Sequence, residues 1–291
     1  MAVTKMTNTE LSVAIVIVLY NPSDDEIANV QRLAEVYPGA VVDNSAEEAF
    51  KGSQVGRMCY VPLHENTGIA KAQNIGSRYV LEQTDATHIV FLDQDSTVAG
   101  TYPQDIATAF EKIRQDFPKL GFLGPATENK ETGRAYKSVV HKDHALSDDF
   151  IPRRELISSG GCTTREVLEE VGLNEERLFI DYVDFEWCWR ARHKGFICGF
   201  TPRVTIRHMV GHKTIYICGY TIILSSPFRY YYQFRNHLWL SRRGYVPLQW
   251  KVNHAIKHLA RLFYFPILIK SGGTYWRYMV KGLAAGIRKP R

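Results

Sequence analysis

The sequence predicts an α/β protein in which an open sheet is flanked by helices and a basic helical segment follows. Residues 11–20 (LSVAIVIVLY) form a β-branched apolar run, typical of a strand buried on both faces of a sheet. Strand and helix patterns then alternate along the chain, and polar residues follow three of the predicted strands. An open, right-handed sheet with a ligand site at the carboxyl ends of its strands accounts for these observations.

The spacing of apolar residues predicts the remaining elements. Further strands are expected at 40–42, 60–63, 88–92 and 204–207, and helices at 24–37, 68–81, 103–117, 164–171 and 183–193. Gly172 and Gly195 follow the last two of these helices, where glycine commonly ends a helix. The polar stretch 128–149 is expected to loop over or beside the site.

Composition is that of an ordinary globular chain, with 45% hydrophobic and 23% charged residues among 291. It excludes disordered, collagen-like and polytopic membrane proteins. We expect one large unit at 1–215, followed by a helical segment at 216–291. Five cysteines without a CxxC pair indicate neither a disulfide framework nor a zinc site. Because the first ten residues lack a secretory pattern, a cytoplasmic location is expected.

The charges are unevenly distributed. Residues 1–186 hold all 30 Asp and Glu with 17 of the 36 Lys and Arg, whereas residues 187–291 hold the other 19 and no acid. Residues 227–291 are also rich in Tyr, Trp and Phe, and no run reaches the ~18 apolar residues that span a bilayer. This mixture suits an anionic membrane surface. Single-stranded nucleic acid is the alternative polyanion, which we do not expect, and a homodimer would bury the same aromatic surface.

A pair of carboxylates follows the strand predicted at 88–92. Asp93 and Asp95 are two residues apart, so in an extended chain both point to the same side. Such oxygens hold a hard divalent cation, Mg²⁺ or Mn²⁺, which neutralises a diphosphate. A solvated turn or a helix cap is the alternative. Asn21 and Asp43 follow two other strands, and we expect them to converge with Asp93 on one crevice.

A second acidic segment, 179–190, places Asp181, Asp184 and Glu186 among bulky apolar residues. Burial raises the pKa of a carboxyl group and suits it to accept a proton. Asp184 is expected near the start of the helix at 183–193. The alternative makes Asp184 a helix cap and Glu186 a first-turn acid stabilised by the helix dipole.

His208 is a candidate metal ligand. His212 lies four residues further on, but 204–207 has a strand pattern, which breaks the helical geometry that a joint site would need. A single histidine near the metal is therefore the expectation, and a surface or core histidine is the alternative.

Seven segments in this order resemble the family 2 glycosyltransferases of the GT-A fold, and within them the rhamnosyltransferases that build bacterial surface polysaccharides. They are VLYNP (18–22), VDNS (42–45), ENTGIAKAQNIG (65–76), FLDQDS (91–96), ISSGG (157–161), FIDYVDFEWCWRAR (179–192) and RYYYQFRN (229–236). The resemblance covers roughly residues 11–240. It implies a mixed sheet flanked by helices and an inverting, metal-dependent transferase. The catalytic unit would be 1–215, with donor binding at 11–100 and the acceptor and base region at 120–215.

The resemblance also implies roles for individual residues. The donor-site residues are Asn21, Asp43, Asn66, Lys71 and Asp93, and the metal motif is Asp93 with Asp95. Asp43 would suit the N3–H of a thymine or uracil ring. Asp184 stands where the family places the Asp of its Glu-Asp pair and would deprotonate the acceptor hydroxyl. Val183 replaces that Glu, which leaves Asp181 as a second candidate base.

The implied donor is dTDP-β-L-rhamnose, and the product is an α-L-rhamnoside. Sibling enzymes of the same fold use UDP or GDP sugars. The implied acceptor is a saccharide on polyprenyl diphosphate, which places the enzyme peripherally at the inner face of the cell membrane. FLDQDST also fits a DxDxT phosphatase with Asp93 as nucleophile. Two strand-helix units precede that strand here and no acid follows Glu186, both unlike such phosphatases.

Overall fold

The computed structural model describes residues 11–129, 145–208, 213–217 and 220–288, without the side chains of 127–129, 207–208, 213–217 and 220–223. The strands of its main sheet are β1 (Val13–Leu19), β2 (Gly39–Asp43), β3 (Gln54–Val55), β4 (Met58–Pro62), β5 (His88–Asp93), β6 (Leu120–Asn129), β7 (Ile151–Pro152), β8 (Cys162–Thr164) and β9 (Ile197–His208). Their order is β3-β4-β2-β1-β5-β8-β6-β9-β7. The sheet is mixed, as the resemblance implied.

The helices of this part are α1 (Asp24–Ala34), α2 (Ile69–Gln83), α3 (Tyr102–Asp116), α4 (Arg165–Val171) and α5 (Val183–His193), with a 3-10 turn at Glu176–Leu178. Every residue of β1 is buried. Its odd-numbered side chains pack with α1 and α3, and the even-numbered Ala14 and Val16 pack with α2, α4 and α5 on the other face. The prediction of a strand buried on both faces is confirmed.

Parallel pairing brings three polar strand ends to one edge of the sheet. Leu19 at the end of β1 is in register with Asp43 of β2, and Val18 is in register with Asp93 of β5. The carboxyl ends of these strands therefore lie side by side, as expected for an open α/β sheet.

Several boundaries differ from the predictions. α1 ends at Ala34 rather than at residue 37, β4 begins at Met58, and β9 extends from Ile197 to His208. The short strands β3, β7 and β8 were not predicted, since two or three residues carry no periodicity. They exist because neighbouring strands supply their hydrogen-bond partners.

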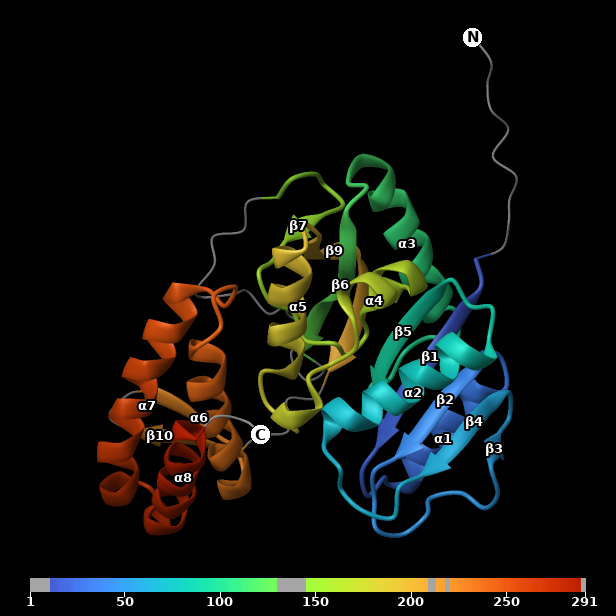
Figure 1. Cartoon of the computed structure of the whole chain (residues 1–291). Coiled ribbons are helices and arrows are strands. Elements are labelled where there is room, and N and C mark those ends of the chain that lie inside the picture. The colour runs from blue at the N-terminus through green and yellow to red at the C-terminus, as the bar shows by residue number, and fades with distance from the viewer. Residues whose placement is uncertain (1–10, 130–144, 209–212, 218–219, 289–291) are drawn as a thin grey trace.

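A C-terminal helical part lies beside α5 (Figure 1). It contains α6 (Pro227–Ser241), α7 (Leu248–Leu268) and α8 (Gly272–Ile287), preceded by the hairpin of β10 (Lys213–Ile217) and β11 (Tyr220–Leu224). Tyr230, Phe234, Phe265 and Met279 form the core of these helices. Trp250 also packs with Val183 and Trp189, which joins the two parts. Within the described residues, no helix is long and apolar enough to cross a membrane.

Candidate active site

An open cleft of about 1300 Å³ lies at the carboxyl ends of β1 and β5, facing the segment that precedes α5. Five of the predicted site residues line it: Asn66, Asp93, Asp95, Asp181 and Asp184. Tyr20, Asn44, Ser158, Arg229 and Tyr232 are among the other lining residues. The two acidic segments, almost ninety residues apart in sequence, therefore share one cleft.

The turn after β5 is anchored to the end of β1. The Gln94 side chain accepts a hydrogen bond from the Tyr20 backbone N–H (2.6 Å) and donates one to the Tyr20 carbonyl (3.3 Å). This reciprocal pair holds the residue between the two carboxylates against the neighbouring strand. Asp93 and Asp95 both line the cleft, as the prediction that alternate residues share a face required.

Asp43 lies behind the cleft wall and is 1% exposed. Its carboxylate accepts hydrogen bonds from the Tyr60 hydroxyl (2.6 Å) and from the backbone N–H groups of Ser45 (3.0 Å) and Ala49 (2.9 Å). Burial, together with this bond to Asp43, raises the pKa of Tyr60 to about 12. Asp43 thus shapes the turn that follows β2, and its contact with a base stays a prediction.

Asn66 is held by the residue that follows Asp43. Its side-chain oxygen accepts hydrogen bonds from Asn44 (2.9 Å) and from the Gly68 backbone N–H (3.0 Å). Gly68 has φ 87°, and a Cβ there would lie 2.6 Å from the Phe179 carbonyl oxygen. The start of α2 is therefore packed directly against the loop that carries Asp181, and Gly68 itself lines the cleft.

Two predicted residues, Asn21 and Lys71, lie outside the lining of the cleft, and the side chain of a third, His208, is not described. Asn21 is exposed beside Tyr20, with its N–H bonded to the Ser45 hydroxyl at 2.7 Å. Lys71 is exposed on the first turn of α2, outside the lining of the cleft. His208 ends β9, but its side chain is not among those described, and His212 lies outside the described residues. Their roles in donor and metal binding stay predictions.

Asp184 is the second residue of α5 and is partly buried in the cleft. The residue before this helix is Tyr182, so Asp184 is not its N-cap. Burial and the nearby negative charge of Asp93 raise its pKa to about 6, although hydrogen bonds from the N–H and hydroxyl of Ser158 act to lower it. A carboxyl group with this pKa accepts a proton near neutral pH.

A chain of hydrogen-bonded polar side chains supports Ser158. Gln73 of α2 donates to the Ser158 hydroxyl oxygen at 2.9 Å and accepts from the Asn174 side chain at 2.9 Å. Gln73 is only 3% exposed, so the chain is fixed by packing. It leads from Asn174 through Gln73 and Ser158 to Asp184.

Asp181 has a different environment. Its carboxylate forms a two-point ion pair with Arg229 of α6, at 2.6 and 3.2 Å. Its side chain is 8% exposed. The two-point contact engages both oxygens of the Asp181 carboxylate with one guanidinium. The geometry therefore distinguishes the two acids that the sequence left as alternatives.

The loop before α5 is backbone-strained. Phe179, Asp181 and Tyr182 have φ values of 66°, 65° and 68°, a region that residues other than glycine rarely occupy. Asn236 of α6 donates hydrogen bonds to the carbonyl oxygens of Leu178 (2.9 Å), Ile180 (2.8 Å) and Asp181 (3.1 Å). Such strain persists only where surrounding contacts compensate for it, and α6 provides those contacts.

Arg235 acts beside Asn236. It donates to the carbonyl oxygens of Arg177 (2.7 Å) and Leu178 (3.0 Å), and its guanidinium lies over the rings of Tyr232 and Trp239 at 4.6 and 4.3 Å. The C-terminal helices therefore help to shape the cleft, because α6 holds the loop that lines it. Arg229, Arg235 and Asn236 all belong to the segment RYYYQFRN, for which the sequence suggested no individual roles.

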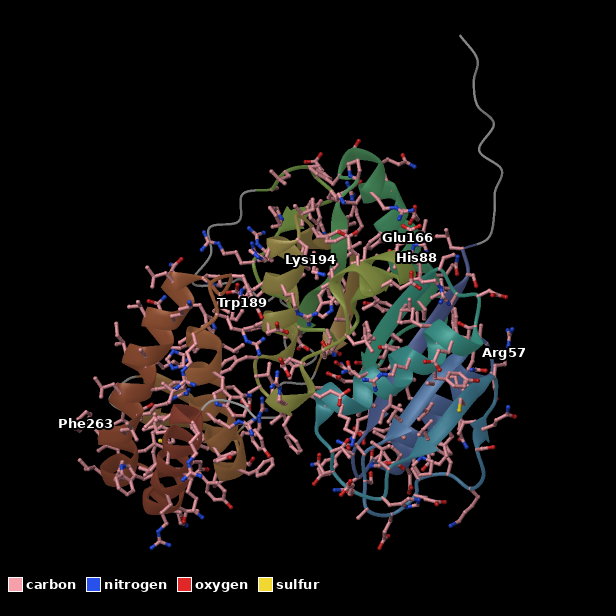
Figure 2. The ribbon with its side chains drawn as sticks, viewed as in Figure 1. Arg57, His88, Glu166, Trp189, Lys194 and Phe263 are labelled. Atoms are coloured by element: carbon pink, nitrogen blue, oxygen red, sulfur yellow. The ribbon has the colours of Figure 1, made fainter. Side chains whose placement is uncertain are left out.

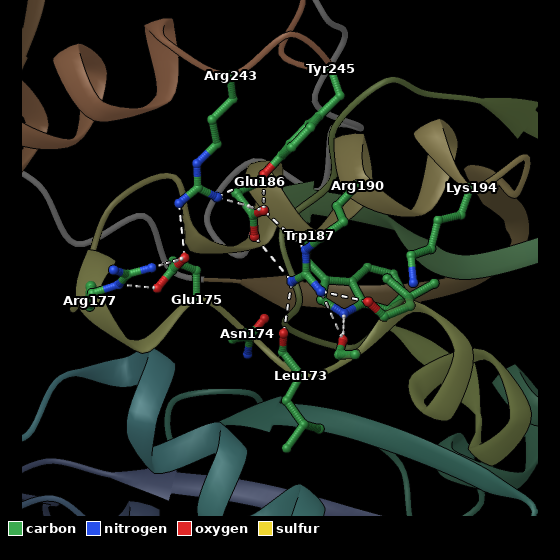
Figure 3. Close-up of polar contacts among 12 residues, drawn as sticks. Leu173, Asn174, Glu175, Arg177, Glu186, Trp187, Arg190, Lys194, Arg243 and Tyr245 are labelled. Carbon is green, nitrogen blue, oxygen red and sulfur yellow. Dashed lines mark hydrogen bonds and ion pairs between the residues drawn. The ribbon is translucent and has the colours of Figure 1, made fainter. Parts of the chain in front are cut away.

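Glu186 is structural. It is fully buried, and Figure 3 shows Arg243 and Tyr245 reaching it from the segment after α6. Arg190 pairs with the same carboxylate from the next helical turn at 3.0 Å. Burial, followed by the charge of Glu186, raises the pKa of Tyr245 to about 12. Glu186 does lie in the first turn of α5, as the alternative interpretation expected. Its direct partners are the side chains of Arg190, Arg243 and Tyr245, in addition to any effect of the helix dipole.

The described residues suit a metal ion that is bound partly by the protein and partly by a bound diphosphate. Among them, no three His, Cys, Asp or Glu side chains are grouped to hold an ion. Asp93 and Asp95 supply two carboxylates on the cleft wall. Mg²⁺ is commonly held by one or two carboxylates together with phosphate oxygens and water. The donor set therefore suits a cation bound jointly by the protein and a diphosphate.

The site residues that the sequence did not reveal are polar side chains near the acids: Ser158, which lines the cleft, and the buried Gln73 and Asn236. Gln73 and Asn236 are at most 3% exposed. An amide residue at a position that falls on the apolar face of a predicted helix is an unusual feature that the sequence does show. Its partner, however, lies 85 residues away for Gln73 and 55 to 58 residues away for Asn236, which no local pattern reveals.

Comparisons with known proteins identify relatives of this chain. Residues 40–172 match the family described as Glycosyl transferase family 2. The chain is 32% identical to the dTDP-rhamnosyl transferase RfbF of Shigella flexneri, over 94% of each protein. It is 23% identical to the Low-salt glycan biosynthesis hexosyltransferase Agl10 of Haloferax volcanii, over 67% of this chain and 66% of that one.

Two solved glycosyltransferase structures share the fold. S. aureus TarS 1-349 superposes with a TM-score of 0.56 at 13% identity, covering 95% of this chain and 81% of that one. GalNAc-T7 with UDP, GalNAc and Mn²⁺ has a TM-score of 0.52 at 15% identity, covering 86% and 55%. These likenesses concern the GT-A fold alone. The family match over residues 40–172 and the relative that is 32% identical over almost its whole length show that this chain belongs to the family 2 glycosyltransferases.

Proposed function

We propose that this glycosyltransferase moves L-rhamnose from dTDP-β-L-rhamnose to a saccharide acceptor, with inversion at the transferred carbon. The observation that carries the proposal is the single cleft that has Asp93 and Asp95 on one wall and Asp184, a carboxyl group with a raised pKa, on another. The phosphatase alternative, with Asp93 as nucleophile, is set aside because the chain belongs to a transferase family.

In the proposed reaction, the carboxylate of Asp184 takes the proton of the acceptor hydroxyl. The acceptor oxygen forms a bond to the anomeric carbon, and the bond between that carbon and the diphosphate oxygen breaks. The leaving dTDP carries away the bonding electron pair. Attack from the face opposite the diphosphate inverts the anomeric centre. Ser158 and Gln73 orient the base, and Arg229 holds the Asp181 carboxylate in an ion pair.

Asp93 and Asp95 would hold a divalent cation, which neutralises charge on the diphosphate when bound. At the start of α2, where Gly68 and Ile69 line the cleft, the positive end of the helix dipole favours an anion. Asn66 lies beside that helix start. We propose that these groups bind the donor diphosphate, with Asn21, Asp43, Lys71 and His208 as further candidate contacts.

The choice of sugar rests on the relative named dTDP-rhamnosyl transferase. UDP or GDP sugars are the alternative donors. We further propose a cytoplasmic enzyme that meets a lipid-linked acceptor at the inner membrane face, with residues 1–215 as the catalytic unit and 216–291 as an appendage. The excess of cations in residues 187–291 supports an anionic partner.

Calorimetric titration of dTDP, UDP and GDP tests the donor assignment. In the presence of Mn²⁺ or Mg²⁺, dTDP is expected to bind at least ~10-fold more tightly than the other two, because a site shaped for dTDP buries the thymine methyl group and leaves the ribose 2′-hydroxyl of UDP or GDP without a partner. EDTA is expected to weaken dTDP binding. Tighter binding of UDP or GDP would replace rhamnose by another sugar, and no binding of any nucleotide would overturn the proposed site.

Replacing Ser158 by Ala is expected to shift the acidic limb of kcat/KM upward by about 0.5–1 pH unit, since the variant loses a hydrogen bond that stabilises the charged form of Asp184. The pH profile of kcat/KM reports this titration in the free enzyme. Ser159→Ala is the matched control, because the Ser159 hydroxyl pairs with Ser96 at 3.0 Å. An unshifted limb in Ser158→Ala would show that this bond does not set the pKa of the base.

A further inference from the structure

The outer face of α7 carries a continuous apolar surface that nothing in the described structure covers. We call it the α7 stripe, and it consists of Leu248, Val252, Ile256, Leu259, Phe263 and Ile267. Its members recur every three or four residues, so they share one face of the helix. Their exposed fractions run from 47% at Val252 to 80% at Ile267. Figure 2 shows Phe263 on the outer side of the C-terminal helices.

The opposite face of α7 already forms the packing contacts of the helix. Trp250, His258 and Phe265 are buried, with His258 stacked on Phe234 at 4.2 Å and Phe265 packed on Tyr230 at 5.1 Å. An ordinary surface helix buries one apolar face and keeps the other polar. The α7 stripe therefore does not contribute to the packing of the described structure. An exposed apolar patch of this kind marks an interaction surface.

The neighbouring helix repeats the pattern. α8 packs against α7 and exposes Trp276, Val280 and Ile287. Exposed cations accompany both sets of apolar side chains, and they are Lys257, Lys270, Arg277 and Lys281. Because no Asp or Glu follows Glu186, no acid of the C-terminal helices offsets these charges. The surface thus combines apolar side chains with cations.

This combination decides which partner fits. A second copy would bring another acid-free, cationic surface against the first, and like charges would oppose the contact. Nucleic acid offers anions but no apolar interior for aliphatic side chains. An anionic lipid bilayer offers both, with charged headgroups above hydrocarbon.

We propose that α7 lies in the plane of an anionic membrane surface, with the α7 stripe inserted below the headgroups and the nearby cations among them. The inference deepens the proposed membrane location by naming the surface, and it rests on that part of the proposed function. Trp276 of α8 is suited to the same interface, where tryptophan is enriched.

Cosedimentation of the full chain with lipid vesicles tests the proposal. The parent protein is expected to bind vesicles of phosphatidylcholine with phosphatidylglycerol and to bind pure phosphatidylcholine at least ~10-fold more weakly, with the difference reduced at high salt. The triple variant Ile256→Ser, Phe263→Ser, Ile267→Ser is expected to lose at least ~10-fold in binding to the anionic vesicles. Val36→Ser is the matched control, because Val36 is 52% exposed and lies just after α1.

Titration of dTDP into each variant separates this proposal from the proposed reaction. Nucleotide affinity and thermal unfolding of the triple variant are expected to match the parent, since the changed side chains are exposed and far from the cleft lining. Unchanged vesicle binding in the triple variant would overturn the role of the α7 stripe. Loss of a dimer in the triple variant, without loss of vesicle binding, would assign the stripe to a homodimer instead. Retention on single-stranded nucleic acid without vesicle binding would overturn the lipid partner.

Discussion

Replacing Asp184 by Asn is expected to lower kcat by about 10²–10⁴-fold, which is the usual contribution of a general base. The amide keeps the shape of the carboxylate and accepts hydrogen bonds from Ser158, but it cannot take the proton of the acceptor hydroxyl. Because the lost interaction belongs to the transition state, the affinity for dTDP is expected to change by no more than about a factor of two. Single-turnover assays and calorimetric titration measure the two quantities.

Asp181→Asn is the matched comparison for this variant. It removes the charge that pairs with Arg229 and leaves Asp184 in place. We expect it to reduce activity less than Asp184→Asn and to lower thermal stability, because a partly buried guanidinium loses its partner. If Asp181→Asn abolished transfer and Asp184→Asn retained a tenth or more of it, Asp181 would be the base.

Thermal unfolding of metal-free Asp184→Asn provides a second readout. Folding raises the pKa of Asp184 from 3.8 to about 6, so the folded state favours the protonated form. Ionisation between about pH 4 and pH 6 therefore lowers the free energy of unfolding, and this cost is fully present above pH 6. Asparagine carries no charge, so the variant is expected to unfold at a higher temperature than the parent at pH 7 to 8. An equal or lower unfolding temperature would show that burial of this charge costs no stability.

Replacing Asp95 by Ala is expected to weaken dTDP binding in the presence of Mn²⁺ by on the order of 100-fold, because one of two protein carboxylates for the cation is lost. Binding in EDTA is expected to be similar for parent and variant. The cation neutralises diphosphate charge, so kcat is also expected to fall. Titration of dTDP at several Mn²⁺ concentrations separates lost metal affinity from lost nucleotide affinity.

Asp116→Ala is the control for the change in charge. Asp116 is an exposed carboxylate at the end of α3, outside the lining of the cleft. Both variants remove one negative charge, so a nonspecific electrostatic effect would appear in both. Equal dTDP affinity in EDTA and in Mn²⁺ for the parent protein would contradict a shared metal at Asp93 and Asp95.

Local patterns in the sequence determined the helices and strands that carry the cleft. β1, α2, β5 and α5 were predicted from apolar periodicity, because each is long enough to repeat its pattern. The resemblance in seven ordered segments identified the family and the GT-A fold. Asp93, Asp95, Asp181 and Asp184 were all chosen from short-range spacing, and all four line the cleft.

Only the tertiary structure distinguished residues of the same type. Asp181 and Asp184 look alike in sequence, but Arg229, 48 residues away, pairs with one of them, and Ser158 binds the other. Glu186 is structural because Arg243 reaches it from 57 residues downstream. The α7 stripe emerged in the same way, since α7 carries Trp250, His258 and Phe265 on one side and the α7 stripe on the other, and packing decides which side is buried. Periodicity records which side chains share a face, whereas the environment that sets a pKa or an ion pair comes from distant segments that folding brings together.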